Sequence, residues 1–319
     1  MAMEGRPRVT NLILHQYELS PFSEKVRRIL AFKGLPWSAV RAPAVMPKPD
    51  LLALTGGYRK IPVLQVANHV YCDSARIAEY LEDLQPEPSL YPSPLAPLLA
   101  DWADSLLFES TVPLVLRPTR FDALLRWLTP DEQQRMLDDR KAMRKDALRL
   151  APSPKSTLAF FGVHVARLEA ALRGREYLVA DRPCIADFSV YHCLWIVGQV
   201  APERLAPFGA LRAWMERIAA LPDPAITELS SEAALRVARD SAPEWTAGVP
   251  FEDPMGFAAG QTVQVRASDY AREPVIGELV SSNARELVLR RTDERAGCVY
   301  VHFPRVGYEV TPPTTASIR

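Results

Sequence analysis

The stretch KIPVLQVANHVYCDSARIAEYL, residues 60–81, decides the fold of this 319-residue chain. Two short apolar runs, Val63–Val66 and Val70–Cys72, flank Asn68-His69, which is a two-residue signal for the turn of a β-hairpin. Ser74–Leu84 then carries apolar residues at helical spacing. The stretch therefore predicts a pair of antiparallel strands followed by a helix.

The residues before this stretch predict a strand, a helix and a second strand. Leu12–Tyr17 is a short apolar run of the kind that forms a buried strand. Pro21–Lys33 has helical spacing and stops at Gly34, and Trp37–Arg41 then completes a β-α-β unit. A β-α-β unit followed by a β-β-α unit is the thioredoxin-like arrangement, which we assign to residues 10–92.

The middle of the chain shows helical periods almost throughout, so we expect an all-helical domain at residues 94–245. The candidate helices are Pro94–Leu116, Pro130–Leu150, Thr157–Arg173, Ile185–Gln199, Pro207–Leu221 and Glu228–Asp240.

The last part of the chain alternates apolar and polar residues in five short segments separated by turn signals. We expect a small all-β module at residues 256–311, either a barrel or an SH3-like sheet. Its strands are predicted around Val263–Val265, Val275–Val280, Leu287–Leu289, Val299–Phe303 and Tyr308–Val310.

Composition and charge exclude several classes of function. Lys plus Arg equals Asp plus Glu at 38 each, so no net field recruits nucleic acid or an anionic membrane. The four cysteines form no CxxC pair and the five histidines have no ligand spacing, which argues against a metal site. We find no secretory signal and no run of about 20 apolar residues, and we expect a cytoplasmic protein.

Ser20-Pro21-Phe22-Ser23 lies between the first predicted strand and the first predicted helix. Serine suits the N-cap of a helix, and proline suits its first residue. The N–H groups and the dipole of a helix N-terminus also stabilise an anion such as a thiolate. A serine hydroxyl can donate a hydrogen bond to that sulfur, and such donors lower the pKa of a thiol. The motif therefore fits both capping and thiol activation.

Two further motifs also admit a structural and a functional interpretation. In Lys60-Ile61-Pro62, proline marks the first residue of a strand, because it has no N–H for a sheet. A trans bond before it would make an ordinary turn, whereas a cis bond would present the backbone of Ile61 to an extended ligand. Asp73-Ser74 begins the next helix as its N-cap, or holds a ligand carboxylate at that helix end.

These motifs, in this order, resemble those of the glutathione transferase superfamily, in a serine-type, bacterial-like form with an added C-terminal β module. The matching segments are SPFSEKVR at residues 20–27, KIPVL at 60–64 and DSARIAEYL at 73–81. The resemblance extends less specifically to Ile185-Ala186-Asp187-Phe188, which matches the family's structural capping segment, with Cys184 in place of the usual Ser or Thr. Asp187 is therefore expected to be structural.

The resemblance implies that glutathione is the co-substrate. It places Ser20 at the position of the catalytic serine, with Tyr17 as the fallback, near the catalytic tyrosine of other classes. It implies that Lys60 reaches the glycyl carboxylate, that Ile61, before Pro62, pairs its backbone with the cysteinyl unit, and that Asp73 and Ser74 hold the γ-glutamyl end. Because residue 20 is not cysteine, reductase chemistry through a mixed disulfide is not expected.

The function that we expect is a transferase activating the glutathione thiol for attack on an apolar electrophile, with a detoxification role and a homodimeric state by family resemblance. An isomerase or a dehalogenase would use the same site. The alternative is a non-catalytic glutathione-binding or protein-interaction protein that keeps the fold, which the β module favours because the ordinary family architecture ends with the helical domain.

Overall fold

The computed structural model describes residues 11–116, 129–147, 153–242, 245 and 250–313. These residues form two units. The sheet unit takes its described residues from Met1–Tyr17, Pro36–Ile77 and Ala225–Arg319, and the helical unit takes its own from Glu18–Leu35 and Ala78–Pro224.

The N-terminal elements follow the predicted thioredoxin-like order. Strand β1 runs parallel to β2 and antiparallel to β3, and β3 and β4 form a hairpin. The elements are β1 (Ile13–Gln16), α1 (Pro21–Lys33), β2 (Trp37–Arg41), α2 (Pro49–Thr55), β3 (Val63–Val66), β4 (His69–Cys72) and α3 (Ser74–Leu84). The thioredoxin-like class of this part of the chain is confirmed.

Two local details differ from the prediction. The hairpin turn is Ala67-Asn68, one residue earlier than expected, and Ala67 takes a left-handed φ of 55°. Helix α2 is an additional element: Pro49 occupies its first turn, and Gly56 ends it with a φ of 75°, a conformation that glycine adopts without steric cost.

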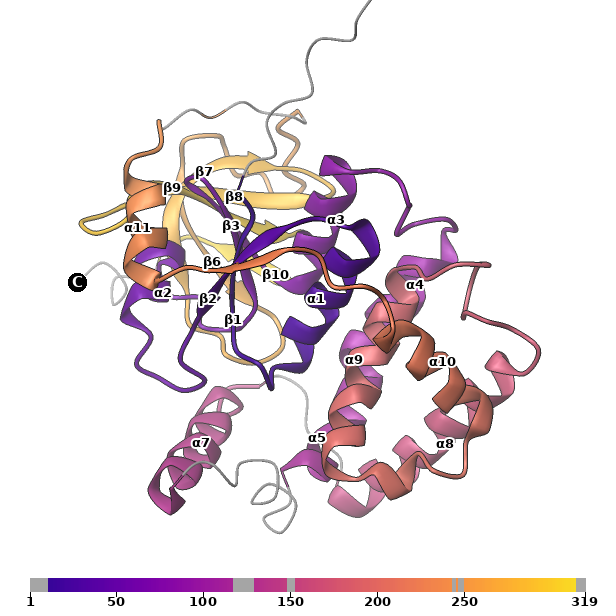
Figure 1. Cartoon of the computed structure of the whole chain (residues 1–319). Coiled ribbons are helices and arrows are strands. Elements are labelled where there is room, and N and C mark those ends of the chain that lie inside the picture. The colour runs from indigo at the N-terminus through magenta and orange to yellow at the C-terminus, as the bar shows by residue number, and fades with distance from the viewer. Residues whose placement is uncertain (1–10, 117–128, 148–152, 243–244, 246–249, 314–319) are drawn as a thin grey trace, which may run out of the picture. The chain divides into compact units, whose positions relative to one another are not determined.

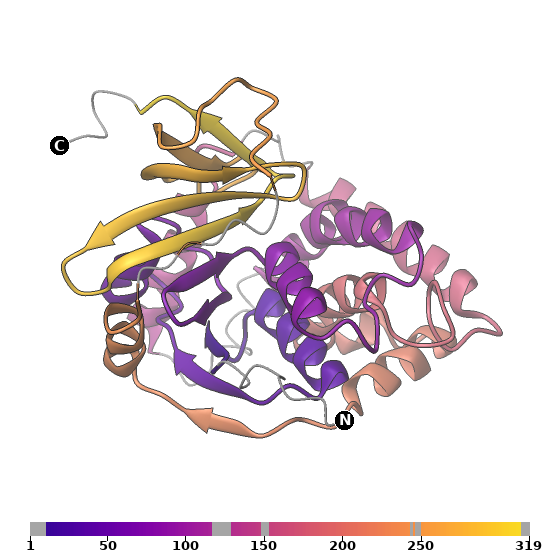
Figure 2. The same ribbon diagram turned by 90° about the horizontal axis from the view of Figure 1, so that it is seen from above.

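The C-terminal strands join the thioredoxin-like sheet. The five strands β6–β10 pair antiparallel with one another, and β9 pairs parallel with β4, opposing Val70 to Val301. The resulting ten-stranded order is β10-β6-β7-β8-β9-β4-β3-β1-β2-β5. Figure 1 and Figure 2 both show the orange-to-yellow strands beside the indigo-to-purple N-terminal strands. The new strands are β6 (Thr262–Ala267), β7 (Val275–Ser282), β8 (Glu286–Asp293), β9 (Gly297–Pro304) and β10 (Tyr308–Thr311).

The opposite edge of the sheet carries a strand that the sequence does not predict. β5 (Ile226–Glu228) pairs parallel with β2, and the helix expected from Glu228 begins three residues later as α11 (Ser231–Arg239). Ser230 caps this helix, because its hydroxyl accepts the N–H of Ala233 at 3.1 Å. β5 has only three residues, Ile-Thr-Glu, all exposed, which are too few to show an alternating pattern in the sequence.

One hydrophobic core serves both sets of strands. Tyr58 and Val63 from the N-terminal part lie in the same buried cluster as Leu289, Val301 and Phe303 from the C-terminal part. The rings of Tyr58 and Phe303 are 6.0 Å apart between centroids. The C-terminal strands therefore share their core with the thioredoxin-like sheet.

A chain of polar groups also crosses the seam between β4 and β9. The Nδ1 of His69 lies 2.9 Å from the Nε2 of His302, whose Nδ1 lies 3.0 Å from an Oε2 of Glu286. Arg76 donates to the same oxygen at 2.9 Å. Burial acts to raise the pKa of Glu286, but His302 and Arg76 hold it at about 2. The junction between β4 and β9 therefore includes a buried ion pair in addition to the backbone pairing of the two strands.

The helical unit contains the remaining elements, and every helix predicted for residues 94–245 except Glu228–Asp240 is present in it; that helix is α11 of the sheet unit. Helix α9 packs against α1, α4 and α5. The elements are α4 (Leu95–Trp102), the π-helical stretch η1 (Ala103–Leu107), α5 (Phe108–Val115), α7 (Pro130–Met143), α8 (Pro154–Leu172), α9 (Ile185–Val200), the short 3₁₀ helix η2 (Pro202–Arg204) and α10 (Gly209–Ala219). Residues 148–150 of one predicted helix lie outside the described residues.

The stability of the sheet unit depends on pH through the side chain of His15. Its side chain is buried on β1, with Nε2 2.9 Å from the Oε1 of Gln65 on β3. Burial lowers the pKa of His15 to about 4, although the hydrogen bond acts in the opposite direction. Because an unfolded histidine titrates near 6.5, protonation between these two values favours the unfolded chain, and stability falls as the pH falls.

We predict that His15→Gln removes this part of the pH dependence. Glutamine keeps an N–H donor for Gln65 but does not titrate. Chemical denaturation at several pH values from 7 to 4 should show the wild type losing up to about 3 kcal/mol more than the variant. Other buried histidines remain in both proteins and cancel in the comparison. Parallel pH curves would contradict this account.

Candidate functional site

The strand register brings most of the predicted site residues to one end of the sheet. Val63 opposes both Cys72 and His15, so the ends of β1 and β4 and the beginning of β3 coincide. The residues just beyond these positions are Tyr17, Ile61-Pro62 and Asp73-Ser74. We call this the ligand end of the sheet. The structure therefore groups, within one unit, residues that lie up to 57 positions apart in the sequence.

Lys60, Ile61 and Pro62 form the approach to β3. The Ile61–Pro62 peptide bond is cis, and the Ile61 side chain lies in the shared core. The Lys60 ammonium donates to Asp269 of the β6–β7 loop at 2.6 Å. The backbone arrangement considered from the sequence is thus present, and the lysine charge is paired within the chain.

Asp73 and Ser74 begin α3. Asp73 has a φ of 76°, and its Oδ1 accepts the N–H of Ala75 at 2.9 Å, so the capping interpretation holds. Its Oδ2 accepts a hydrogen bond from the hydroxyl of Tyr308 at 3.0 Å. Ser74 is buried as the first residue of the helix. Both carboxylate oxygens of Asp73 therefore have partners in this structure.

Ser20 belongs to the helical unit, where it caps α1. Its Oγ accepts the N–H of Ser23 at 3.2 Å, Pro21 is the first helical residue, and Ser20 is 2% exposed. A hydroxyl that accepts a hydrogen bond still carries its own proton for donation. Capping and donation to a sulfur are therefore compatible at this residue.

Tyr17 follows β1 at the ligand end of the sheet. Its ring is half-buried and packs against the shared core. This position matches the structural interpretation of a last aromatic residue after a buried strand, and Ser20 remains the preferred candidate.

Asp187 is a structural residue in the helical unit. Its carboxylate accepts from the N–H groups of Leu178 and Cys184, both at 3.0 Å, and from the indole of Trp214 at 2.8 Å. The Cys184 thiol also lies 3.2 Å from it. Burial raises the pKa of Asp187, although these donors act in the opposite direction. The Asp187 carboxylate thus accepts hydrogen bonds both at the start of α9 and from a buried indole.

We predict that Asp187→Ala destabilises the fold by about 3 kcal/mol or more, because several buried donors lose their acceptor. The matched variant Asp187→Asn keeps an oxygen acceptor and should lose less. Urea unfolding followed by tryptophan fluorescence measures both. A loss below about 1 kcal/mol for the alanine variant would contradict the structural role.

The helical unit contains a buried charged cluster that was not predicted from the sequence. The Lys25 ammonium lies 2.6 Å from Oδ2 of Asp104, which also accepts from Ser189 at 3.2 Å. The Nε2 of His192 lies 2.9 Å from Oδ1 of the same carboxylate. Burial acts to raise the pKa of Asp104, but Lys25 and His192 hold it at about 2. The cluster ties α1 to α9, and Lys25 of α1 within the SPFSEKVR motif was the one signal that could have pointed to it.

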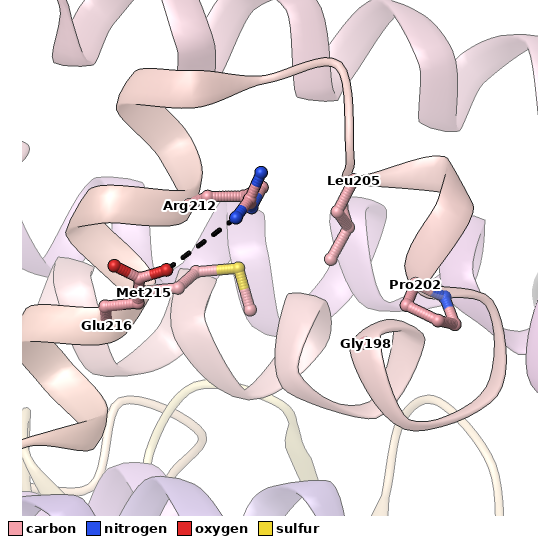
Figure 3. A pocket seen from close by; sticks show the side chains of 6 residues that line it. All are labelled: Gly198, Pro202, Leu205, Arg212, Met215 and Glu216. Carbon is pink, nitrogen blue, oxygen red and sulfur yellow. Dashed lines mark ion pairs between the residues drawn. The ribbon is translucent and has the colours of Figure 1, made fainter.

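A shallow pocket also lies in the helical unit, between α9 and α10. Figure 3 shows Leu205 and Met215 facing this space, with the ion pair of Arg212 and Glu216 beside it at 3.9 Å. Its lining contains none of the site residues predicted from the sequence. Within the described ranges, no three His, Cys, Asp or Glu side chains come together as metal ligands. None of the described helices has the length and hydropathy needed to span a bilayer.

Comparison with known proteins identifies the family of this chain. The glutathione S-transferase N-terminal domain matches residues 14–89, and the glutathione S-transferase C-terminal domain matches residues 118–222. A GST-like protein from Pseudomonas syringae, known from its crystal structure, is 37% identical, with a TM-score of 0.78 over 95% of this chain and 100% of that one. The chain belongs to the glutathione S-transferase superfamily. Because the match to the Pseudomonas protein covers 95% of this chain, it includes most of strands β6–β10.

Two curated relatives differ in their named roles. FtsZ-localized protein A of Caulobacter vibrioides is 24% identical over 218 residues, which are 66% of this chain and 87% of that protein. The probable maleylacetoacetate isomerase 1 of Drosophila melanogaster is 34% identical over 89 residues, which are 26% of this chain and 36% of that protein. This superfamily member thus resembles both a named enzyme and a protein named for its location.

Proposed function

We propose that this superfamily member is a glutathione transferase-like enzyme that binds glutathione in an extended form. The Ile61 backbone, ahead of Pro62, pairs with the cysteinyl unit, Lys60 binds the glycyl carboxylate, and Asp73 with Ser74 holds the γ-glutamyl end. The observation that supports this most strongly is the register that places these residues at one end of the sheet. A tripeptide of extended length can use all of them together.

The proposed chemistry begins with ionisation of the glutathione thiol. A hydrogen bond from the Ser20 hydroxyl, together with the N-terminal dipole of α1, stabilises the thiolate and raises its population at neutral pH. The thiolate then attacks an electrophilic carbon of an apolar co-substrate, forming a C–S bond while the leaving group departs with its electron pair. The acceleration comes from positioning the two reactants and from the larger thiolate fraction.

The net reaction depends on the electrophile. Conjugation, isomerisation and dehalogenation all start from the same thiolate, and the resemblance to a named isomerase covers only 26% of this chain. A cytoplasmic location, a homodimeric state and a role in detoxification accompany this proposal by family resemblance.

A second function is favoured by the contacts of the C-terminal strands. Lys60 and Asp73 are engaged by Asp269 and Tyr308, and one relative is named for its localisation with FtsZ. A non-catalytic glutathione-binding or protein-interaction protein would also keep this fold. A turnover assay with a general chromogenic electrophile, run beside calorimetric titration with glutathione, separates the two. We expect both binding and turnover; binding without turnover on a panel of electrophiles would favour the second function.

We predict that Ser20→Ala lowers the rate of conjugation about 10-fold or more, because it removes a hydrogen bond to a charged sulfur. The dissociation constant for glutathione should change much less. Ser20→Thr keeps the hydroxyl and the cap, and it is the matched control; Tyr17→Phe tests the fallback residue. Steady-state kinetics, calorimetry and melting temperatures distinguish these effects. Equal losses of rate and affinity in the alanine variant, or loss of neither, would reject the catalytic role of Ser20.

A further inference from the structure

The β6–β7 loop, residues 268–274, lies along the segment that precedes β3. The Lys60 ammonium contacts the Asp269 carboxylate at 2.6 Å and lies 4.2 Å from the centroid of the Tyr270 ring. The Lys60 side chain is only 12% exposed, whereas that of Asp269 is 53% exposed. The loop therefore covers the lysine, while its own carboxylate remains accessible to solvent.

The same loop is seated closely on the backbone beside Lys60. A Cβ on Gly57 would lie 2.8 Å from the carbonyl oxygen of Pro274, and Gly57 has a φ of 141°. Glycine is thus required here both by its conformation and by the close approach of the loop. The Arg59 guanidinium adds an ion pair with Glu273 at 3.2 Å. The loop therefore contacts the segment before β3 in three ways: by ion pairs with Lys60 and Arg59 and by a close backbone approach to Gly57.

Strand β10 makes the corresponding contact with Asp73. The hydroxyl of Tyr308 donates to Oδ2 of Asp73 at 3.0 Å, and the Tyr308 ring packs on Phe303 with centroids 5.2 Å apart. Burial and the charge of Asp73 raise the pKa of Tyr308 well above its usual value, so the hydroxyl keeps its proton. Tyr308 is therefore a neutral hydrogen-bond donor to this carboxylate.

These contacts have the chemistry of the two ends of a tripeptide. Asp269 presents a carboxylate to Lys60, as a glycyl carboxylate would, and Tyr308 presents a hydrogen-bond donor to Asp73, as a γ-glutamyl ammonium would. The two partners come from the C-terminal strands, and they meet residues on either side of the β3–β4 hairpin. The C-terminal addition thus contacts both charged groups, Lys60 and Asp73.

We propose that the C-terminal strands act as an internal competitor for the glutathione site, so that the tripeptide binds only by displacing Asp269 from Lys60 and Tyr308 from Asp73. This inference rests on the proposed function, because it assumes that Lys60 and Asp73 bind glutathione. Because the glycyl carboxylate has to replace that of Asp269 at Lys60, the strength of this ion pair sets the glutathione concentration at which the site fills. This ion pair is weak enough to be exchanged in this way, because its carboxylate is 53% exposed to solvent.

The test is a calorimetric titration of the full chain with glutathione. Asp269→Asn removes the competing charge, and Tyr308→Phe removes the competing hydroxyl while keeping the ring in the core. The matched control is Glu278→Gln, which removes a partly exposed carboxylate of β7 that pairs with Arg290 on the neighbouring strand. Melting temperatures confirm that each variant is folded.

We expect the Kd for glutathione to fall up to about 5-fold in Asp269→Asn and about 10-fold or more in the double variant, with Glu278→Gln unchanged. Unchanged affinity in all variants would overturn the competitor while leaving the glutathione site in place. Weaker binding in the variants would also overturn it, because Asp269 and Tyr308 would then belong to the site. If neither wild type nor the double variant binds, the proposed function fails, and the competitor fails with it.

Discussion

The parallel pairing of β4 with β9 is the constraint on which the sheet unit depends. Without it, β4 would be an edge strand with unpaired N–H and C=O groups, which invite association with other chains. With it, five C-terminal strands continue the thioredoxin-like sheet and share its core. The same pairing carries the β6–β7 loop and Tyr308 to the ligand end of the sheet. The C-terminal addition and the proposed binding groups are therefore parts of one structure.

Most elements of this fold could be predicted from the sequence, with α2 and β5 as exceptions, but their long-range pairing could not. Alternation located β6–β10, and helical spacing located α8, α9 and α11, because these signals are local. The pairing of Val70 with Val301 joins residues 231 positions apart, and nothing in either segment specifies the partner. β5 was missed because three exposed residues carry no pattern. The predicted module was thus recognised as strands but not as an extension of the first sheet.

The candidate site was likewise only partly predictable from the sequence. The motifs around Lys60 and Asp73 were visible because proline, aspartate and serine have specific backbone roles at the ends of strands and helices. Their partners Asp269 and Tyr308 were not, since each is an ordinary residue of a distant loop or strand. Ser20 was identified as both a cap and a candidate donor, and the cap is present. The sequence therefore indicated which groups could bind, and the structure added what those groups contact.

Hydrogen–deuterium exchange of the full chain with and without glutathione tests most directly whether the tripeptide displaces the β6–β7 loop at the ligand end of the sheet. Saturating glutathione should slow exchange in residues 60–64 and 73–77, the segments proposed to bind the tripeptide. It should at the same time speed exchange in residues 268–274, which lose their contact with Lys60. Slower exchange in both regions, or no change in either, would contradict the account.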